Sequence, residues 1–371
     1  MSTRIETEEQ DGAHRRRLLV DGEPVSRLWV LDRAIRLLGR EVSAAGIGGV
    51  RTRPEHRNRG YARRLLRDTV GFMTDGGWQV SMLFGIPDFY HRFGFAPCIA
   101  VEQTTVLRTR AAERAGRQAS DYRDRPVEEA DRPFIVDTYN RTEADRPASV
   151  VRDAERFRRF ERGTGWETEA VGRVLEDERG ERIGYLACND EEAEVNCVEA
   201  GAAVPAAYPA LTDYLARLAV ERRCGELRLH LPVDHPLAVH ARRYGCLCRV
   251  RYQRTGGGMM RVLNQGELLG RLRPALEERL RRSRFRGAGV DLTLETDLDA
   301  TTLALNPDGR GRLRLRVEMP QEALMQVAAG YRPAADAAKD PKVHCKPEAV
   351  ELLEALFGEQ PVAYVHWPER F

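Results

Sequence analysis

The chain has little lysine, no surplus of one charge and no long apolar run. Its only lysines are Lys339, Lys342 and Lys346, and 59 basic side chains face 57 acidic ones, for a formal net charge of +2. A dedicated nucleic-acid-binding protein needs a positive surplus to displace counterions from phosphates, so we expect no nucleic-acid partner. A membrane-spanning helix needs about 20 consecutive apolar residues, which the sequence does not offer, and the charged N-terminus is unlike a signal peptide. We therefore expect a cytoplasmic protein with no membrane association.

The cysteines are odd in number, and their spacing is irregular. The seven cysteines form no Cys-x-x-Cys pair, and no two histidines form a His-x-x-x-His pair. These absences disfavour a disulfide framework and a zinc site, so we expect reduced thiols and no metal. The ordinary apolar content, 42% of 371 residues, excludes disorder as the main state and is enough for two or three domains with full cores.

The most informative segment is a strand that leads through a basic, glycine-containing turn into a helix. Ala45–Arg51 has strand character, and apolar residues from Tyr61 to Val70 repeat with helical spacing. Unpaired N–H groups at such a helix start, together with arginine side chains, suit a diphosphate, and Gly60 lets a ligand approach the backbone. The sequence matches neither a P-loop nor a dinucleotide fingerprint. A basic helix start solvated by water is the simpler alternative. The predicted phosphate cradle comprises Arg57, Asn58, Arg59, Gly60, Tyr61, Ala62 and Arg63.

A second segment, residues 89–95 (Phe-Tyr-His-Arg-Phe-Gly-Phe), places a tyrosine among aromatic residues after the strand Val80–Phe84. A phenol has a pKa above that of a thiol and stays protonated at neutral pH, so Tyr90 could protonate a departing thiolate. The alternative is a core tyrosine that packs against Phe89 and Phe93.

The same pattern recurs later in the chain. Pro205 takes the place of Pro54 in the second copy, and Gly245 takes the place of Gly94. The number of residues between the two prolines equals the number between the two glycines, which indicates a duplicated fold. The second copy has no glycine or arginine in the segment Tyr208–Asp213, where the first has its cradle, and Ala241 stands opposite Tyr90. We expect it to be a scaffold. The arginine-rich stretch from 108 to 132 is predicted to link the copies, and residues 1–14 to form a frayed tail.

A third region begins near residue 263. Leu268–Arg281 is expected to be an amphipathic helix, followed by strands at Asp291–Leu305 and Arg312–Met319 and by helices at Gln321–Gly330 and Pro347–Phe357. This mixture is typical of a small α+β domain.

The motif Arg57-x-x-Gly60-x-Ala62 after a Gly-Val strand resembles the acetyl-CoA pyrophosphate loop of GNAT-superfamily acetyltransferases, and residues 89–95 resemble their later Tyr-x-x-x-Gly-Phe segment. The whole arrangement resembles the Eis (enhanced intracellular survival) family. That resemblance implies a mixed α+β fold. It comprises a GNAT domain (1–118) that lacks the usual first strand and helices, a degenerate GNAT-like domain (119–262) and a sterol-carrier-like domain (263–371). It also implies a homo-oligomer, commonly a hexamer.

The resemblance further implies an N-acetyltransferase that moves the acetyl group of acetyl-CoA directly to an amine. The backbone at Val50 and Thr52 would pair with the pantetheine arm, and the cradle would hold the pyrophosphate. Tyr90 would be the general acid. The terminal carboxylate of Phe371 would be the general base, because a free α-carboxylate is ionised at neutral pH. An ordinary mobile terminus is the alternative for Phe371.

Two departures from the family bear on the acceptor. Family domains usually open with a strand and two helices, and these helices form much of the wall of the acceptor site. Here too few residues precede the strand-like Arg27–Leu31 to form that strand and both helices. Arg370, beside the terminal carboxylate, disfavours polycationic acceptors such as aminoglycosides, although Glu369 offsets part of its charge. An aminoglycoside-like amine and a protein or peptide amine both stay open. The competing interpretations are a non-catalytic acyl-CoA-binding or assembly module and a lipid carrier.

Overall fold

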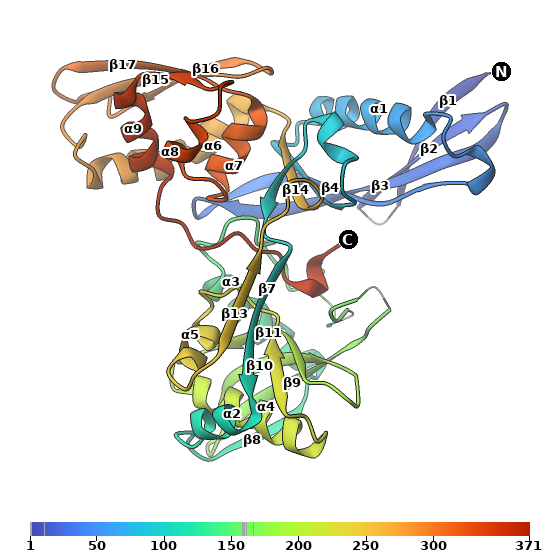
Figure 1. Cartoon of the computed structure of the whole chain (residues 1–371), viewed down its shortest axis with the longest axis vertical. Coiled ribbons are helices and arrows are strands. Elements are labelled where there is room, and N and C mark those ends of the chain that lie inside the picture. The colour runs from blue at the N-terminus through green and yellow to red at the C-terminus, as the bar shows by residue number, and fades with distance from the viewer. Residues whose placement is uncertain (1, 11, 158–159, 161, 166) are drawn as a thin grey trace.

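A computed structural model describes residues 2–10, 12–157, 160, 162–165 and 167–371. Three sheets, of seven, seven and four strands, organise these residues, and helices pack on each of them (Figure 1). The first and third sheets lie at the same end of the molecule, and the second sheet forms the other end (Figure 1). The predicted mixed α+β fold class is confirmed.

The first sheet has the strand order β1-β2-β3-β4-β5-β14-β6. Its first four strands are antiparallel neighbours in the sequence. Asp21-Gly22 and Leu38-Gly39 connect β2 to β3 and β3 to β4, and all four residues have positive φ, as two-residue hairpin turns require. The strands are β1 (Thr3–Gln10), β2 (Ala13–Val20), β3 (Glu23–Leu37), β4 (Arg40–Thr52), β5 (Val80–Gly85), β6 (Ala96–Ile99) and β14 (Gly257–Val262).

The start of the chain differs from the prediction. Thr3–Gln10 pairs with β2 along its whole length, from Thr3 opposite Val20 to Gln10 opposite Ala13, so the predicted frayed tail is wrong. A first strand is therefore present, although the sequence suggested that it was missing. Within residues 2–10 and 12–52 the structure has no helix, because hairpin turns join the strands directly.

One face of these strands is covered by α1 (Tyr61–Asp75), which the short 3-10 helix η1 (Pro54–His56) precedes. Leu18, Leu28 and Val30 on the strands form one buried cluster with Leu65 and Leu66 of the helix. Because side chains alternate across a strand, the residues between them point to the opposite face.

The second sheet has the order β13-β7-β12-β11-β10-β9-β8. The predicted linker from 108 to 132 is wrong, because most of it forms α2, β8 and the start of α3. The order β11-α4-β12-α5 repeats β4-α1-β5-η2, where η2 is Tyr90–Phe93, and Gly94 and Gly245 end the two units with φ of 75° and 89°. The elements are β7 (Glu102–Arg108), β8 (Tyr122–Pro126), β9 (Ala170–Asp177), β10 (Arg182–Asn189), β11 (Asn196–Ala202), β12 (Glu226–Leu229), β13 (Leu247–Arg251), α2 (Thr109–Gly116), η3 (Glu129–Asp131), α3 (Arg132–Thr142), α4 (Ala207–Glu221) and α5 (Pro236–Arg242).

The first two sheets exchange strands. The chain leaves the first sheet after β6 and enters the second with β7, and it returns from β13 to β14, which lies between β5 and β6. Two crossing segments therefore join the sheets (Figure 1). Sheet membership thus does not follow the predicted boundaries 1–118 and 119–262, which remain predictions.

The third sheet, of order β16-β15-β17-β18, packs with its helices against the first. Leu268, Leu272 and Leu352 share one buried cluster with Ile35 and Val80 of the first sheet. The strand predicted at Asp291–Leu305 is in fact two strands, joined by a turn in which Thr296 N–H donates to Asp299 O at 2.8 Å. The elements are α6 (Gln265–Arg282), β15 (Gly289–Glu295), β16 (Ala300–Leu305), β17 (Arg312–Glu318), α7 (Gln321–Ala328), α8 (Ala334–Ala337), β18 (His344–Cys345), α9 (Pro347–Phe357) and η4 (Trp367–Glu369).

Candidate active site

The two parallel strands β4 and β5 separate near the middle of the first sheet. They pair only between Ala44–Ile47 and Val80–Leu83, after which β5 continues alongside β14. Beyond Ile47, β4 has no partner strand on that side within the described residues. A β-bulge also interrupts its pairing with β3, between the pairs Trp29–Gly48 and Arg27–Arg51. Backbone N–H and C=O groups that leave a ladder need other partners, and an extended amide chain can provide them.

The predicted cradle lies just after this open edge, at the start of α1. Gly60 caps the helix with φ 80° and offers no side-chain acceptor, and the first intrahelical hydrogen bond runs from Arg64 N–H to Gly60 O at 3.0 Å. The N–H groups of the first helical residues therefore lack intrahelical partners, and the helix dipole is positive there. Arg57, Arg59 and Arg63 are exposed beside them. This donor set fits a pyrophosphate.

A cavity of about 800 Å³ opens where β4 and β5 separate. Three predicted site residues, Val50, Tyr90 and Phe371, meet in its lining, whereas the cradle residues lie outside it. Its wall is mainly apolar, and no Asp or Glu side chain contributes to the described lining. The other lining residues are Gln10, Ala13, Trp29, Leu31, Ile47, Gly48, Gly49, Phe84, Ile86 and Arg162.

Tyr90 both lines the cavity and belongs to an aromatic cluster. Its ring makes T-shaped contacts with Phe89 and Phe95, at centroid distances of 5.0 and 6.4 Å. The ring also packs against Gly85, where a Cβ would lie 2.5 Å from its Cδ2 atom. Burial raises the pKa of Tyr90, so the phenol remains a proton donor at neutral pH. Packing and a chemical role are thus compatible at this residue.

Phe371 reaches the same cavity from the other end of the chain. Its ring covers Gly46, where a Cβ would lie 2.5 Å from Cζ, and it meets the Phe84 ring edge-on at 6.0 Å. Its carboxyl carbon lies 3.5 Å from the position that a Cβ of Gly48 would take. Glycine at both positions gives the terminal residue access to the open edge of β4.

The C-terminal tail, which runs back between the first and second sheets (Figure 1), is held by buried charges. Arg152, almost fully buried, contacts Glu199 and Glu369 at 2.5 Å each. Burial alone would raise the pKa of Glu199, but the charge of Arg152 outweighs it and keeps that pKa low. His366 lies 3.2 Å from Glu143, which is also buried. No local sequence signal marks these residues, which are far apart in the chain and meet only in the fold.

Several absences hold for the described part of the chain. No group of three or more His, Cys, Asp or Glu side chains is placed to bind a metal ion. No described helix is long and apolar enough to cross a membrane. All seven cysteines have free thiols.

Residues 4–98 match the family model described as "Acetyltransferase (GNAT) domain". No curated protein matches the sequence. Among solved structures, the chain is similar to a GCN5-related N-acetyltransferase from Kribbella flavida (19% identity, TM-score 0.67, 96% of this chain and 88% of that one). It is also similar to a probable N-acyltransferase from Enterococcus faecalis V583 (13%, 0.73, 100% of both). A third similar structure is Eis1 from Mycobacterium abscessus (17%, 0.64, 96% and 90%). Residues 4–98 thus match a GNAT acetyltransferase domain, and the whole chain shares its fold with these proteins.

Proposed function

We propose that this chain is an N-acetyltransferase that transfers the acetyl group of acetyl-CoA directly to an amine. The observation that carries the proposal is one cavity at the open edge of β4, lined by both a buried phenol and the terminal residue, next to a helix start that suits a pyrophosphate. The match of residues 4–98 to a GNAT domain supports the same reaction class.

The co-substrate acetyl-CoA supplies the thioester, and each part of it has a matching surface. The backbone of Val50 and Thr52, at the end of β4, faces the pantetheine arm. Backbone N–H groups near Val50, where a bulge interrupts the pairing of β4 with β3, polarise the thioester carbonyl. The cradle from Arg57 to Arg63, with Asn58, Arg59, Gly60, Tyr61 and Ala62 between them, holds the pyrophosphate through backbone N–H groups and arginine side chains.

Two residues move protons. The carboxylate of Phe371 accepts a proton from the acceptor ammonium directly or through water. The resulting amine forms the new N–C bond as the C–S bond breaks. The nitrogen then releases its second proton to water as the amide forms, and water later returns a proton to the phenolate that Tyr90 leaves after it protonates the thiolate. Tyr90 then donates its phenolic proton to the departing thiolate, which its raised pKa permits because the phenol stays protonated until that moment.

The remaining domains support this site. The second copy begins α4 without glycine or arginine in its first turn, and Ala241, opposite Tyr90, is buried in α5, so we assign this domain (119–262) a scaffold role. The domain from 263 to 371 is sterol-carrier-like in this proposal and delivers the tail. Leu247, Val250 and Tyr252 are exposed on and beside the edge strand β13 and offer an apolar contact surface for a homo-oligomer. Six subunits would match the family that the sequence resembles. Free thiols accord with a cytoplasmic location.

The test is release of free CoA from acetyl-CoA across a panel of amines, with the native chain and Tyr90→Phe. We expect amine-dependent turnover that falls about 10²–10⁴-fold in the variant, because general acid catalysis contributes that much, while the dissociation constant of CoA stays unchanged. CoA binding with no turnover of any amine would instead favour the non-catalytic acyl-CoA-binding module. Undiminished turnover in Tyr90→Phe would remove Tyr90 from the mechanism.

A further inference from the structure

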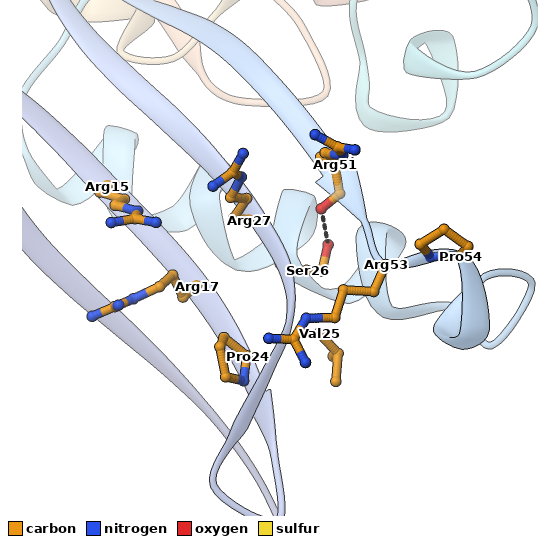
Figure 2. A pocket seen from close by; sticks show the side chains of 9 residues that line it. All are labelled: Arg15, Arg17, Pro24, Val25, Ser26, Arg27, Arg51, Arg53 and Pro54. Carbon is orange, nitrogen blue, oxygen red and sulfur yellow. Dashed lines mark hydrogen bonds between the residues drawn. The ribbon is translucent and has the colours of Figure 1, made fainter.

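Five arginines line a second cavity, of about 290 Å³, on the first sheet. Arg15 and Arg17 come from β2, Arg27 from β3, Arg51 from β4 and Arg53 from the residue after it. Figure 2 shows their side chains on three adjacent strands, near the hydrogen bond from the Ser26 hydroxyl to Arg51 O. We name these five residues the arginine patch.

The patch lies on the face of the sheet that α1 does not cover. Arg16 of β2 faces the helix, where it pairs with Asp68, so its neighbours Arg15 and Arg17 point the other way. Leu28 on β3 likewise packs under α1, and Arg27 points away from it. The uncovered face is the one that a helical wall would hide, and residues 2–10 and 12–52 contain no helix to do so.

Within the patch, positive charges are direct neighbours. Arg17 stands opposite Arg27, and Arg27 opposite Arg51, so three arginines form a row across three strands. Like charges in such positions destabilise a sheet unless an anion compensates them.

Among the described residues, ion pairs compensate two of the five charges. Arg17 lies 3.2 Å from Glu8 and 3.8 Å from Glu6, and Arg53 lies 3.7 Å from Glu23. Within the described residues, Arg15, Arg27 and Arg51 form no ion pair, and the lining of the patch contains no Asp or Glu. The buried Nε atoms of Arg15 and Arg17 also have no hydrogen-bond acceptor among the residues that the structure describes. The patch therefore has donors and charge to offer to an oxyanion.

The patch adjoins the proposed acetyl-transfer cavity. The guanidinium of Arg15 lies 5.6 Å from the centre of the Trp29 ring, and Trp29 lines the larger cavity. Arg27 and Trp29 are two residues apart on β3, about 7 Å along the same face of a strand. A small molecule could thus hold an anionic group at the patch and extend toward Phe371.

We infer that the acceptor is a small amine that carries an oxyanion group, such as a phosphate or a sulfate, and that the arginine patch binds this group. The inference rests on the proposed acetyltransferase function and narrows its substrate class. A polycationic acceptor would meet repulsion from the patch, and the larger cavity offers no acidic side chain in its described lining to attract it.

Two other occupants are testable against this one. The first is the 3′-phosphate of CoA, because Arg53 and Pro54 connect the patch to the cradle. The second is a polycation in a different cavity beside the tail. Its lining holds both acidic residues and arginines, namely Asp32, Glu41, Asp153 and Glu369 with Arg33, Arg152 and Arg156. That cavity is lined by charges of both signs, whereas the charged residues that line the patch are all positive. The patch therefore discriminates more strongly between anionic and cationic acceptors.

The experiment compares matched amines that differ in one phosphate, glucosamine 6-phosphate with glucosamine and phosphoethanolamine with ethanolamine, and adds spermidine as the polycation. Proteins are the native chain, Arg27→Gln, Arg51→Gln and the control Arg281→Gln, an exposed arginine in the last turn of α6. We expect native kcat/KM to favour a phosphorylated amine by about tenfold or more, and each patch variant to lose about tenfold of that preference. Arg281→Gln should retain that preference in full.

A binding measurement makes the outcome independent of the amines chosen. Inorganic pyrophosphate is titrated into protein already saturated with CoA, so that the cradle is filled. We expect binding that weakens about tenfold in Arg27→Gln and in Arg51→Gln. We also expect the ratio of the dissociation constants of CoA and 3′-dephospho-CoA to be the same in native and variant proteins.

Each contrary result would overturn a different part of the inference. No pyrophosphate binding, or binding indifferent to both variants, would refute the oxyanion site. A changed CoA to dephospho-CoA ratio would assign the patch to the co-substrate, and preference for spermidine would assign the acceptor to the mixed-charge cavity. No turnover with any amine would refute the acetyltransferase itself and, with it, the acceptor role, while pyrophosphate binding would still decide whether the patch takes an oxyanion.

Discussion

The contact between Gly46 and the ring of Phe371 allows a sharp test of how the tail is positioned. In Gly46→Ala the new Cβ would lie 2.5, 2.7 and 3.0 Å from three ring carbons of Phe371. Ordinary carbon–carbon contacts lie at about 3.5–4.0 Å, so the ring must withdraw by roughly 1 Å. Phe84 and Arg33 pack around the ring and restrict that movement.

The size of the effect follows from overpacking. Forcing one methyl group into a filled contact typically costs about 1–3 kcal/mol, and here only the docked tail bears that cost. Since about 1.4 kcal/mol corresponds to a tenfold change, we expect the docked fraction relative to the undocked fraction to fall about 5- to 150-fold. Acetyl transfer should decrease, and affinity for CoA should not, because the cradle lies elsewhere.

Carboxypeptidase release of Phe371 reports the docking directly, because the enzyme needs a free terminus. Gly48→Ala is the matched control, since its Cβ would meet the Phe371 carboxyl carbon at 3.5 Å, an ordinary contact. We expect Gly46→Ala to lose Phe371 much faster than the native chain, and Gly48→Ala to resemble the native chain. Equal release rates in all three proteins would refute the contact on which the placement of the tail rests.

Three further predictions concern the cradle, the tail anchor and pH. Gly60→Ala should raise the KM for acetyl-CoA, because Gly60 has φ 80°, whereas Gly71→Ala, in open space on α1, should leave it unchanged in the same steady-state assay. Arg152→Met should lower the free energy of unfolding in urea by about 3–5 kcal/mol, because it leaves the buried carboxylate of Glu199 without its partner, and the double variant with Glu199→Met should recover part of the loss. Burial lowers the pKa of His235 to about 4, so the unfolded chain binds a proton below about pH 6.5 that the folded chain refuses. Between pH 6.5 and 4, His235 should therefore lower the free energy of unfolding by about 1.4 kcal/mol for each pH unit that the pH falls. Urea titrations at pH 7, 6 and 5 should show that the free energy of unfolding of His235→Asn depends less steeply on pH than that of the native chain, by the amount that one proton contributes.

Local patterns predicted the local parts of the site. The strand, glycine turn and helix around Gly60 lie within one continuous segment, so residue spacing alone indicated a helix start at Tyr61. The segment 89–95, which the sequence marks by its aromatic residues, forms the short helix Tyr90–Phe93 that ends at Gly94. The roles assigned to these residues remain proposals, because spacing predicts geometry and not chemistry.

The missed features depend on contacts between distant segments. The arginines of the patch come from three strands, and they form a row only because the register sets Arg17, Arg27 and Arg51 opposite one another. The insertion of β14 beside β5 joins residues that are far apart in the sequence. The strand at Thr3–Gln10 was missed because most of its residues are polar and exposed, so it shows no apolar alternation.

The central claim is that the terminal carboxylate of Phe371 takes the proton of the acceptor amine. The most direct test compares amine-dependent CoA release by the native chain with that by a chain extended by a few residues beyond Phe371, with the CoA dissociation constant measured for both. Extension moves the carboxylate away while it keeps every side chain, so we expect turnover to be lost and CoA affinity to be retained. Equal turnover by the extended chain would contradict the claim and require another base.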